Sequence, residues 1–396
     1  MATGAVDPRR REALVISGWA ATSPYGLGAA AFETGVSAER AAVRELPDRL
    51  RGDGPHEQGG WIPDFDIKAV LGRKGTRSLD RVTALAVSTT GMLLQAAGPG
   101  LVHDRPEAIG LVLGSGHGSV KSIMDFTHES LTAAQPHHVD PAVIPNLVMN
   151  RAAGLSAIWH TIKGPNVTVS GGSLTGLLAL GYATRLVRQG RAEAVLAGAA
   201  EEYSAQRSWL EHHSRADGTR QANGPLGEGA VMMLVEPAHR AAEHGRPVLA
   251  EVLASRFIAF AEPAEAHRAL TRAVSEALKE ADAAADQVDL VVPSDCGGPL
   301  GEQEDAALRT AGFDGEHPAR VVRLRALIGD TSAAASAFQL AAVLSHRNRA
   351  GLALITSIDP DGNSGCTLLR LPSTPAAPRT AADATEASRR EDAGTV

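Results

Sequence analysis

Cysteine is nearly absent from this chain of 396 residues, which contains only Cys296 and Cys366. The two lie far apart and form no Cys-x-x-Cys pair, so neither a disulfide framework nor a zinc site is indicated. Such sparse cysteine is typical of a protein in the reducing cytosol, and we expect a cytoplasmic location. No metal and no cofactor is expected.

Long apolar runs are missing as well. No stretch approaches the roughly 18 apolar residues that a membrane-spanning helix needs. The N-terminus carries a basic run, but the apolar segment behind it is broken by Ser17, Gly18 and Trp19, so it lacks the hydrophobic core of a signal peptide. We therefore expect no membrane contact.

Clustered positive charge is also lacking. The net charge is −7, the pI is about 6.1, and only 4% of the residues are aromatic. No basic stripe interleaved with aromatic residues appears, so nucleic-acid binding has little support. Acidic or amphipathic partners remain open.

Short apolar segments alternate with helical patterns along the chain, which predicts an α/β protein with a mostly buried sheet. The predicted strands are 13–17, 109–113, 194–198, 288–292 and 352–356. The strongest helical patterns cover 80–95, 173–189, 265–281 and 332–344. Some of these helices carry Ala and Leu around their whole circumference, as helices between two sheets do. A layered architecture with buried central helices follows.

A domain boundary is predicted near Gly245-Arg-Pro247, where a charged helix ends and a strand at 248–253 begins. The chain then has an N-terminal tail (1–12), a larger half (13–245), a smaller half (246–371) and a C-terminal tail (372–396). The C-terminal tail has almost no apolar residues to bury, so we expect disorder there and no site.

The most informative segment runs from Asn166 to Gly190. It reads as a β-branched strand, a two-glycine turn and an amphipathic helix headed by Ser173, which together form a nucleophile elbow. A thiol on such a turn would be pushed toward thiolate by the helix dipole. The Ser173 hydroxyl gains far less, because its proton needs a nearby base. Whether that base exists decides whether the protein is an enzyme or the partner of one.

Six further stretches occur in the order found in β-ketoacyl synthases of the thiolase-like superfamily, which the chain resembles over roughly residues 13–371. They are Val15–Gly28, Gly114–Gly118, Asn150–Gly154, Lys163–Val169, Ala192–Glu201 and Pro225–Gly229. The resemblance implies a five-layered αβαβα fold made of two similar halves, and an obligate dimer.

Active ketosynthases use a Cys nucleophile and two His residues, with a Lys nearby. Position by position, the resemblance places the Cys on Ser173, the first His on Ser294 and the second His on Asp330. The Lys position holds Arg325, and the usual Gly-Phe-Gly-Gly-Thr-Asn gating loop reads Pro-Asp-Gly-Asn-Ser-Gly at 360–365. We therefore expect no catalytic residue and regard the four positions as vestigial.

These losses act together on the chemistry. Condensation needs a thiolate to hold the acyl chain and donors, usually imidazoles, to stabilise the charge that develops during decarboxylation. Asp330 would instead place an anion where the enolate forms. The resemblance thus implies a chain-length factor, the KSβ subunit that forms a heterodimer with a catalytic ketosynthase (KSα) in bacterial type II polyketide synthases. Acyl carrier protein would be a transient partner.

A subunit of this kind would use an interface helix to shape the partner's acyl tunnel, because side chains packed at its end limit how many carbons fit. Candidates for the tunnel or interface are His117, Val120, Ile123, Met124 and Thr127. The last four fall on one face of a helix. The same face could simply build the dimer core, and both interpretations can hold together.

Several interpretations of Ser173 stay open. Its hydroxyl could cap its own helix, or it could accept an acyl or malonyl group with Asp330 as base, which would make the protein an acyltransferase or a decarboxylative priming enzyme. The Gly-x-Ser-x-Gly spacing of hydrolases is absent, since position 175 is Thr. A scaffold that only stabilises the ketosynthase is a third possibility. Related subunits commonly carry Gln here, so Ser173 leaves open an aromatic or a reduced, polyene-forming system.

The remaining candidates have plainer interpretations. Cys296, beside the lost first His, is interpreted as a small buried hydrophobe. The histidine pairs at 137–138 and 212–213 suggest a metal, but adjacent side chains point in different directions, so we expect solvated loop histidines. Glu228 is expected to make a structural hydrogen bond in a tight turn.

Overall fold

The fold is known from a computed structural model that describes residues 12–98, 100–214, 224–313, 319–346 and 350–372. The predicted C-terminal tail lies outside the described residues from 373 on, and so does the predicted N-terminal tail up to residue 11. No helix within the described ranges is long and apolar enough to cross a membrane.

Two five-stranded units with the same strand order form most of the molecule. In chain order, the first unit comprises β1 (Leu14–Ser23), β5 (Ile109–Gly114), β6 (Asn166–Val169), β7 (Ala194–Glu201) and β9 (Gly229–Pro237). The second comprises β10 (Ala250–Ala259), β11 (Val288–Val292), β12 (Arg320–Val321), β13 (Gly351–Asp359) and β14 (Asn363–Leu371). Their spatial orders, β6-β5-β7-β9-β1 and β12-β11-β13-β14-β10, are identical when the strands of each unit are numbered in sequence. The chain is thus built from two similar halves.

The two halves share one hydrogen-bonded ladder. Strand β1 pairs antiparallel with β9 along nearly its whole length and also with β10, where Val15 faces Glu251 and Ile16 faces Ala250. The register of β1 shifts between Ile16 and Gly18, a bulge that turns the strand from one half to the other. In each half the first three strands of the spatial order run parallel and the last two pairings are antiparallel.

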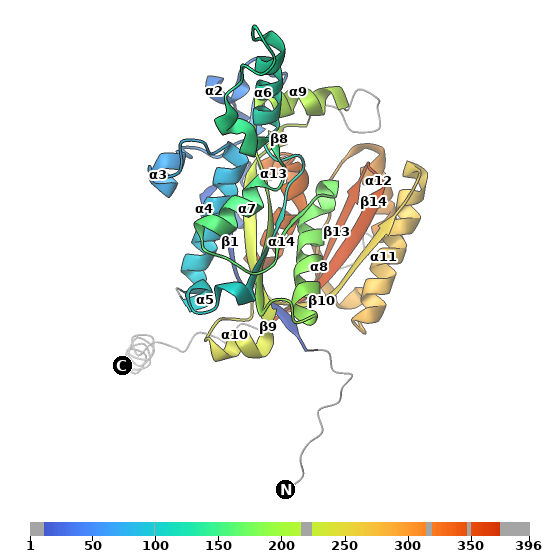
Figure 1. Ribbon diagram of the computed structural model, residues 1–396. Helices are drawn as coiled ribbons and strands as arrows, with labels where there is room; N and C mark the ends of the chain where they lie inside the picture. The colour runs from blue at the N-terminus through green and yellow to red at the C-terminus, as the bar shows by residue number, and fades with distance from the viewer. Residues whose placement is uncertain (1–11, 99, 215–223, 314–318, 347–349, 373–396) are drawn as a thin grey trace, which may run out of the picture.

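Helices cover the sheets in layers (Figure 1). The outer layer of the first half holds α4 (Arg81–Ala97) and α7 (Arg151–Trp159), and that of the second holds α11 (Ala266–Glu280) and α12 (Gly298–Thr310). Between the two halves lie α8 (Thr175–Arg188) and α14 (Ala335–Ser345). Together with the sheets they form the five-layered thiolase-like arrangement that the sequence predicted.

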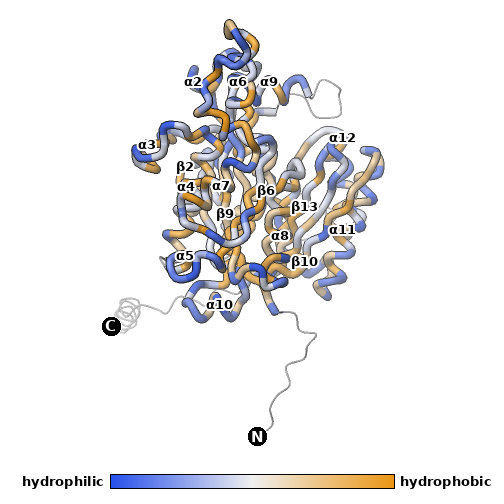
Figure 2. Tube along the Cα trace, in the orientation of Figure 1, coloured by the Kyte–Doolittle hydropathy of each residue, from blue (hydrophilic) through white to orange (hydrophobic). Residues whose placement is uncertain are grey.

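Helix α14 is apolar on nearly every face because it lies between the sheets, whereas α8 leaves Tyr182, Arg185 and Arg188 exposed on one side. In α14 every residue from Ser336 to Leu344 is buried. The helices touch backbone to backbone, since a Cβ on Gly176 would lie 2.2 Å from the amide nitrogen of Ala337. Figure 2 shows the same distribution, with apolar residues along the strands and α8 and polar ones on α5 (Gly100–His103), α10 (Ala238–Glu243) and α11.

Smaller elements complete the chain. The first half also contains α1 (Ala29–Ser37), β2 (Gly26–Leu27), a three-stranded sheet of β3 (Arg44–Glu45), β4 (Gln58–Gly60) and β8 (Leu226–Gly227), and the short helices α2 (Asp48–Arg51), α3 (Ile67–Leu71) and η1 (Pro106–Ala108). Helices α6 (Val120–Thr132), η2 (Pro141–Leu147) and α9 (Ala205–Ser214) stand together at one end of the molecule. Turns η3 (Gly172–Leu174) and η6 (Ser332–Ala334) precede α8 and α14, α13 (Arg325–Ile328) lies before η6, and η4 (Pro263–Glu265) and η5 (Ala285–Gln287) flank α11.

Each strand and long helix predicted from the sequence is present, with ends shifted by a few residues and with 332–334 as a 3-10 turn before α14. Strands β9 and β14 were not predicted. The expected gating loop at 360–365 is shorter than predicted, because β14 already begins at Asn363. The boundary at 245/246 stays a prediction. Helix α10 ends just before it and β10 begins just after it.

Candidate functional site

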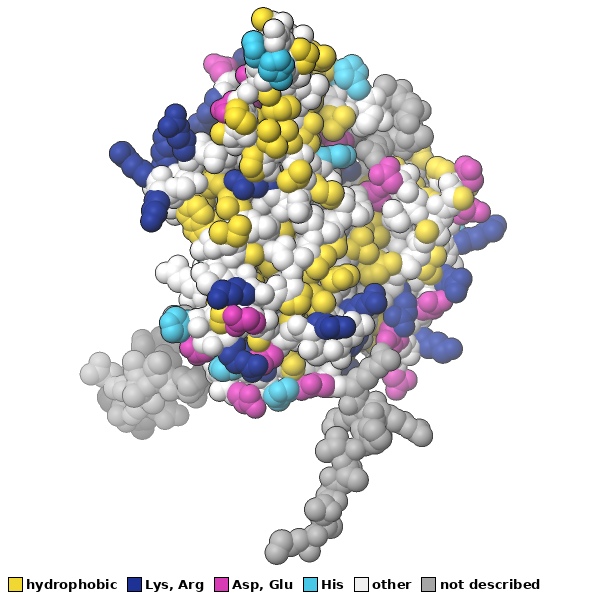
Figure 3. Space-filling model, in the orientation of Figure 1, with side chains coloured by type: hydrophobic (Ala, Val, Ile, Leu, Met, Phe, Trp, Pro, Cys, Tyr) yellow, Lys and Arg dark blue, Asp and Glu magenta, His cyan; other side chains and the backbone are white. Residues whose placement is uncertain are grey.

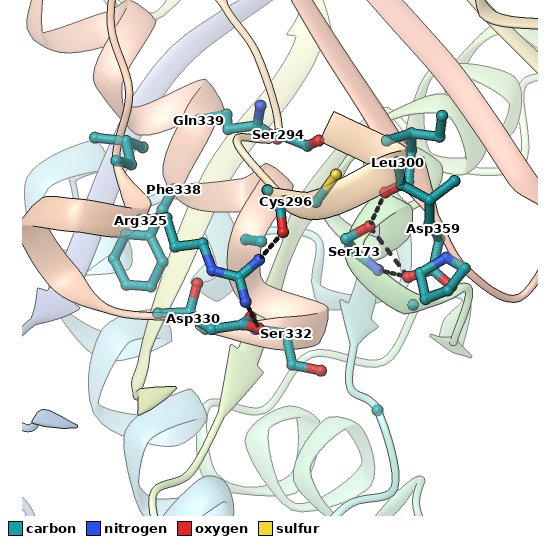
Figure 4. Close-up of a pocket in the computed structure, with 18 of the residues that line it drawn as sticks. Ser173, Ser294, Cys296, Leu300, Arg325, Asp330, Ser332, Phe338, Gln339 and Asp359 are labelled. Atoms are coloured by element: carbon teal, nitrogen blue, oxygen red, sulfur yellow. Dashed lines mark hydrogen bonds and ion pairs between the residues drawn. The ribbon is translucent and has the colours of Figure 1, made fainter. Parts of the chain in front are cut away.

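A cavity of about 200 Å³ lies where parallel strands of both halves end. Residues that follow β5, β6 and β11 and the last residues of β13 line it, a placement typical of ligand sites in α/β proteins. The structure brings all four positions predicted as vestigial, and Cys296, to this one cavity (Figure 4): Ser173, Ser294, Arg325 and Asp330.

Ser173 stands at the turn between β6 and α8, within η3. The preceding Gly172 has a φ of 56°, in the left-handed region that L side chains rarely adopt. A Cβ on Gly172 would also lie 2.0 Å from the Oδ2 atom of Asp359. Glycine is therefore required here both for the turn and for space.

The carboxylate of Asp359, at the end of β13, faces Ser173 directly (Figure 4). Its Oδ2 atom accepts a hydrogen bond from the Ser173 backbone N–H at 2.7 Å and another from the Ser173 hydroxyl at 3.1 Å. The hydroxyl also donates to the carbonyl of Ile358 at 2.9 Å. The interpretation of Ser173 as a cap of its own helix is thus wrong, because its hydroxyl donates outward to β13 and the anion at this helix start is Asp359.

Burial raises the pKa of Asp359 above its ordinary value, and the nearby Asp361 carboxylate adds to the effect. Hydrogen bonds from the N–H groups of Ser173 and Asp361 act in the opposite direction. The next residue, Pro360, has no N–H to donate. The end of β13 therefore presents a carboxylate, and no amide donor at position 360, to the elbow.

Ser294, which the sequence analysis predicted at the first His position, is bound to a buried acid. Its hydroxyl donates to Oε2 of Glu304 at 2.6 Å and its N–H donates to Oε1 at 2.9 Å. The hydroxyl of Thr356 donates to the same Oε1 at 2.6 Å. Glu304 is 1% exposed, and this burial raises its pKa. The group beside this part of the cavity is thus a serine held by a carboxyl.

Arg325 and Asp330 form an ion pair. The Arg325 guanidinium donates to Oδ2 of Asp330 at 2.9 Å and to the carbonyl of Cys296 at 2.7 Å. The other carboxylate oxygen of Asp330 accepts from the N–H of Ser332 at 2.9 Å. Asp330 therefore holds a turn together. The carboxylate that contacts the Ser173 hydroxyl is Asp359 instead.

Cys296 and Gln339 complete the polar part of the wall. Cys296 is partly buried, and burial together with the Glu304 carboxyl raises its pKa to about 12, so it is inert as a nucleophile near neutral pH. Gln339 donates to the carbonyls of Val292 and Thr356 at 2.8 and 2.9 Å. Both residues are thus structural parts of the cavity wall.

The chemistry available in this cavity is limited. Among the described residues that line it, His117 supplies the one imidazole and Arg325 the one guanidinium, and the carboxylates are those of Glu211, Asp330, Asp359 and Asp361. A decarboxylation that builds negative charge needs donors placed at the developing anion. The wall of this cavity carries more carboxylates than cationic groups, so it is an unfavourable place for a further negative charge.

The predicted tunnel residues lie mainly on a different surface. His117 lines the cavity, whereas Val120, Ile123, Met124 and Thr127 lie along α6. Val120 is buried at 5% exposure, Ile123 is half-buried, Met124 is 42% exposed and Thr127 is exposed. Helix α6 packs on η2 and α9, so its predicted face is only partly covered by the described chain.

Further apolar side chains surround this face, and Figure 3 shows them gathered over α6 and η2. We call this set the α6 patch: Met124, Leu131, Ile144, Val148 and Met149, which are 39% to 80% exposed. Contiguous exposed apolar surface on a protein marks an interaction site. The α6 patch lies next to the segment that carries His117, a residue of the cavity wall. The patch therefore adjoins the rim of the cavity.

A buried charge network lies outside the cavity and centres on Glu228. Glu228 is fully buried and accepts two hydrogen bonds from the Arg81 guanidinium, each 2.6 Å long, and others from the N–H groups of Ile62 and Tyr203 at 2.9 and 3.0 Å. The expectation of a single turn hydrogen bond at Glu228 therefore understated its role, since it anchors an ion pair that joins three segments.

Glu202, at the end of β7, holds the start of α6. Its carboxyl accepts hydrogen bonds from the Ser119 hydroxyl at 3.0 Å, the Lys121 N–H at 3.2 Å and the Val82 N–H at 3.3 Å. Burial raises the pKa of Glu202 to about 8 and that of the neighbouring Glu201 to about 7. The N-termini of α4 and α6 thus meet at one carboxyl.

The two histidine pairs lie on different parts of the chain. No group of three or more metal-binding side chains occurs in the parts of the chain that the structure describes. The pair at 137–138 is exposed in a loop, as expected. The pair at 212–213 is also exposed but lies in helix α9 rather than a loop, where His213 stacks on Trp209 with ring centres 5.5 Å apart.

Two protein families match the sequence of this chain. Residues 11–241 match the family "Beta-ketoacyl synthase, N-terminal domain", and residues 256–351 match "Beta-ketoacyl synthase, C-terminal domain". The chain belongs to the β-ketoacyl synthase family. Both matched regions contribute residues to the cavity, the first through Ser173 and the second through Ser294, Arg325 and Asp330.

Three individual relatives illustrate what this chain is similar to. A solved structure, "The ishigamide ketosynthase/chain length factor", is 39% identical with a TM-score of 0.82, over 91% of this chain and 99% of that one. The 3-oxoacyl-[acyl-carrier-protein] synthase 2 of Coxiella burnetii is 24% identical over 90% of each chain. The type II polyketide synthase complex AntDE:AntF, an acyl carrier protein with its hexaketide-bound ketosynthase, shares the fold at 17% identity and a TM-score of 0.76.

Two residues of the site were missed by the sequence analysis. Glu304 lies on the buried face of α12 with Leu300, Ala307 and Leu308. A single Glu on an otherwise apolar helix face was a readable signal for a buried polar contact. Asp359 directly precedes the expected gating loop, but nothing in the local sequence indicates that it reaches Ser173, 186 residues away.

Proposed function

We propose that this protein is a non-condensing chain-length factor, which pairs with a catalytic ketosynthase and shapes its acyl tunnel in type II polyketide biosynthesis. The observation that carries the proposal is the cavity itself. Within an intact ketosynthase-family fold, it holds Ser173, Ser294 and Asp330 where the resemblance places the nucleophile and two imidazoles. The 39% identity to a ketosynthase/chain length factor supports the same assignment.

The α6 patch supports a partner subunit. Its side chains are too exposed to belong to the core of this chain, and a second apolar surface would remove them from water at about 25 cal/mol for each Å² covered. Helix α6 carries Ile123 and Met124 next to the rim of the cavity. Its side chains would therefore contribute to the wall of a tunnel at the interface with the partner subunit. Acyl carrier protein then visits the pair as a transient partner and delivers acyl groups to the catalytic subunit.

The function is tested by assaying condensation with malonyl-acyl carrier protein, using this chain alone, its co-encoded ketosynthase alone and the two together. We expect product from the pair and none from this chain. A matched control combines this chain with a ketosynthase whose nucleophilic Cys is replaced by Ala, which should be inactive. Condensation by this chain alone, or by the control pair, would show that the cavity described above is catalytic.

A second candidate function follows from the contact of Ser173 with Asp359. A carboxylate that accepts the hydroxyl proton is the arrangement of a nucleophile with its base. In this alternative the protein is an acyltransferase or decarboxylative priming enzyme acting through Ser173. Intact-mass measurement after incubation with acyl- and malonyl-acyl carrier protein separates the two functions, because this alternative requires an adduct that Ser173→Ala abolishes.

A further inference from the structure

We propose that the Asp359 carboxylate is a built-in anion that occupies the acyl-oxygen position of the Ser173 elbow, so that the elbow stays closed to acyl groups even when it carries a stronger nucleophile. Asp359 is in this sense a positioning residue that acts through Ser173. The inference deepens the proposed non-condensing function and rests on it.

The evidence begins with one backbone amide. In acyl transfer, the carbonyl oxygen becomes an anion and needs N–H donors close to the nucleophile. The N–H of Ser173, at the start of η3 and α8, is the donor that belongs to the nucleophile's own residue. It already donates to Oδ2 of Asp359 over 2.7 Å, a length typical of a charge-assisted hydrogen bond. An acyl oxygen would have to displace this carboxylate.

The contact is fixed from several sides. Oδ1 of Asp359 accepts from the N–H of Asp361 at 2.9 Å, and Oδ2 accepts from both the N–H and the hydroxyl of Ser173. The carboxylate also packs against Gly172, where any side chain would collide with it. The following Pro360 offers no N–H as a second donor. Asp359 therefore cannot rotate away without losing all of these contacts.

The same geometry argues against Asp359 as a productive base. Its Oδ2 atom would take the hydroxyl proton and at the same time hold the amide that the resulting oxyanion needs. Oδ2 becomes neutral when it takes the proton, but the side chain still stands in front of the Ser173 N–H, so the oxyanion would form without this donor. One carboxylate oxygen cannot serve both steps, so the contact favours closure.

The test introduces a thiol at the elbow and reads its ionisation. The full chain, with its partner ketosynthase if it requires one, is prepared as Ser173→Cys and as Ser173→Cys/Asp359→Asn. The matched control is Ser173→Cys/Asp361→Asn, which removes an equal charge two residues away. Iodoacetamide alkylation, in which the thiolate displaces iodide, is followed by intact mass and peptide mapping between pH 6 and 10. Burial raises the pKa values of Cys296 and Cys366 to about 12, so both react slowly in every variant.

A helix N-terminus alone lowers a thiol pKa below about 8.5, whereas a facing carboxylate raises it. We expect the Ser173→Cys thiol to titrate above about 8.5. We expect Asp359→Asn to increase its alkylation rate at pH 7.5 by about tenfold or more, the effect of one pKa unit, and Asp361→Asn to change it less than about threefold. The other charged groups on the cavity wall, His117, Glu211, Arg325 and Asp330, are common to all variants.

Three results would overturn the proposal. They are a Ser173→Cys thiol that titrates below about 8.5, no acceleration by Asp359→Asn, and an equal acceleration by Asp361→Asn. If Asp359→Asn does not fold, the pH profile of Ser173→Cys alone still decides, since a pKa does not depend on how easily the reagent enters. The readout is thiol ionisation, so it is independent of the condensation assay that tests the proposed function.

Discussion

Arg325 donates to Oδ2 of Asp330 at 2.9 Å, so the two residues that the sequence analysis predicted at the Lys and second His positions neutralise each other. The second guanidinium contact, to the Cys296 carbonyl, joins this pair to the loop before α12. In this structure both side chains hold the cavity wall together.

The first prediction concerns this pair. Its side chains are 22% and 17% exposed, so removing one partner leaves a partly buried charge uncompensated. We expect Arg325→Gln to lower the free energy of unfolding by about 1–2 kcal/mol, and Arg325→Gln/Asp330→Asn to recover part of the loss. Urea denaturation of the wild type, both single variants and the double variant gives the coupling energy. Strict additivity would contradict a stabilising pair.

A second prediction concerns Arg81 and Glu228. Glu228 is fully buried, and Arg81→Met would leave its carboxylate without a countercharge. We expect a loss of about 3–5 kcal/mol in the free energy of unfolding. The matched control is Arg272→Ala in the exposed ion pair with Glu276 on α11, which should leave the free energy of unfolding nearly unchanged because solvent screens the pair. Similar losses at both sites would show that burial does not set the energy of the first pair.

The third prediction is a pH dependence. Burial raises the pKa of Glu202 from an ordinary 4.5 to about 8, so the folded carboxyl keeps a proton that the unfolded chain releases. Its stabilising contribution is complete below pH 4.5 and is lost as the pH rises toward 8. The slope of unfolding free energy against pH should flatten by roughly 1 kcal/mol per pH unit in Glu202→Gln. Urea titrations at several pH values, with exposed Glu129→Gln as control, measure it; identical slopes in all three proteins would contradict the shift.

The fourth prediction concerns polyketide length. Met124 lies on the α6 face and is 42% exposed in this chain, where a partner subunit would cover it. In the complex with the ketosynthase, Met124→Ala should lengthen the product and Met124→Trp should shorten it, each by about one two-carbon unit, because a packed wall resists added volume. Mass spectrometry of the released products measures both variants.

Its control is Glu129→Ala, an exposed position on the same helix that lies off the predicted face. Unchanged lengths in both Met124 variants would remove α6 from the tunnel wall. A change in yield without any change in length would instead identify the protein as a scaffold that only stabilises the ketosynthase.

Much of the fold could be predicted because short-range patterns in the sequence indicate its strands and helices. Apolar runs located β5, β7 and β11, and the apolar circumference of 332–344 placed α14 between two sheets. Strand β14 was missed because turn residues at its start, Asn363 to Gly365, lie in a segment that reads as a loop. Its pairing with β10 and β13 over long sequence distances overrides that local preference.

The candidate site divides in the same way. Residues such as Ser173 and Ser294 were located by motif order, which depends only on the chain. Their partners Asp359 and Glu304 were not, since a hydrogen bond between distant segments leaves no trace in either local pattern. The carboxylate that contacts the Ser173 hydroxyl therefore lies on a strand that no spacing argument reached.

The position of β1 has a consequence for how the chain is made. Residues 14–23 leave the ribosome first, yet their partners in β9 and β10 begin only at residues 229 and 250. At ordinary rates of translation this strand waits roughly 10–40 s before either neighbour exists. Until then it is an apolar segment with two open edges, the kind that invites mispairing. The ladder that unites both halves therefore closes late, and slower synthesis should lower the recovery of soluble protein because it prolongs this interval.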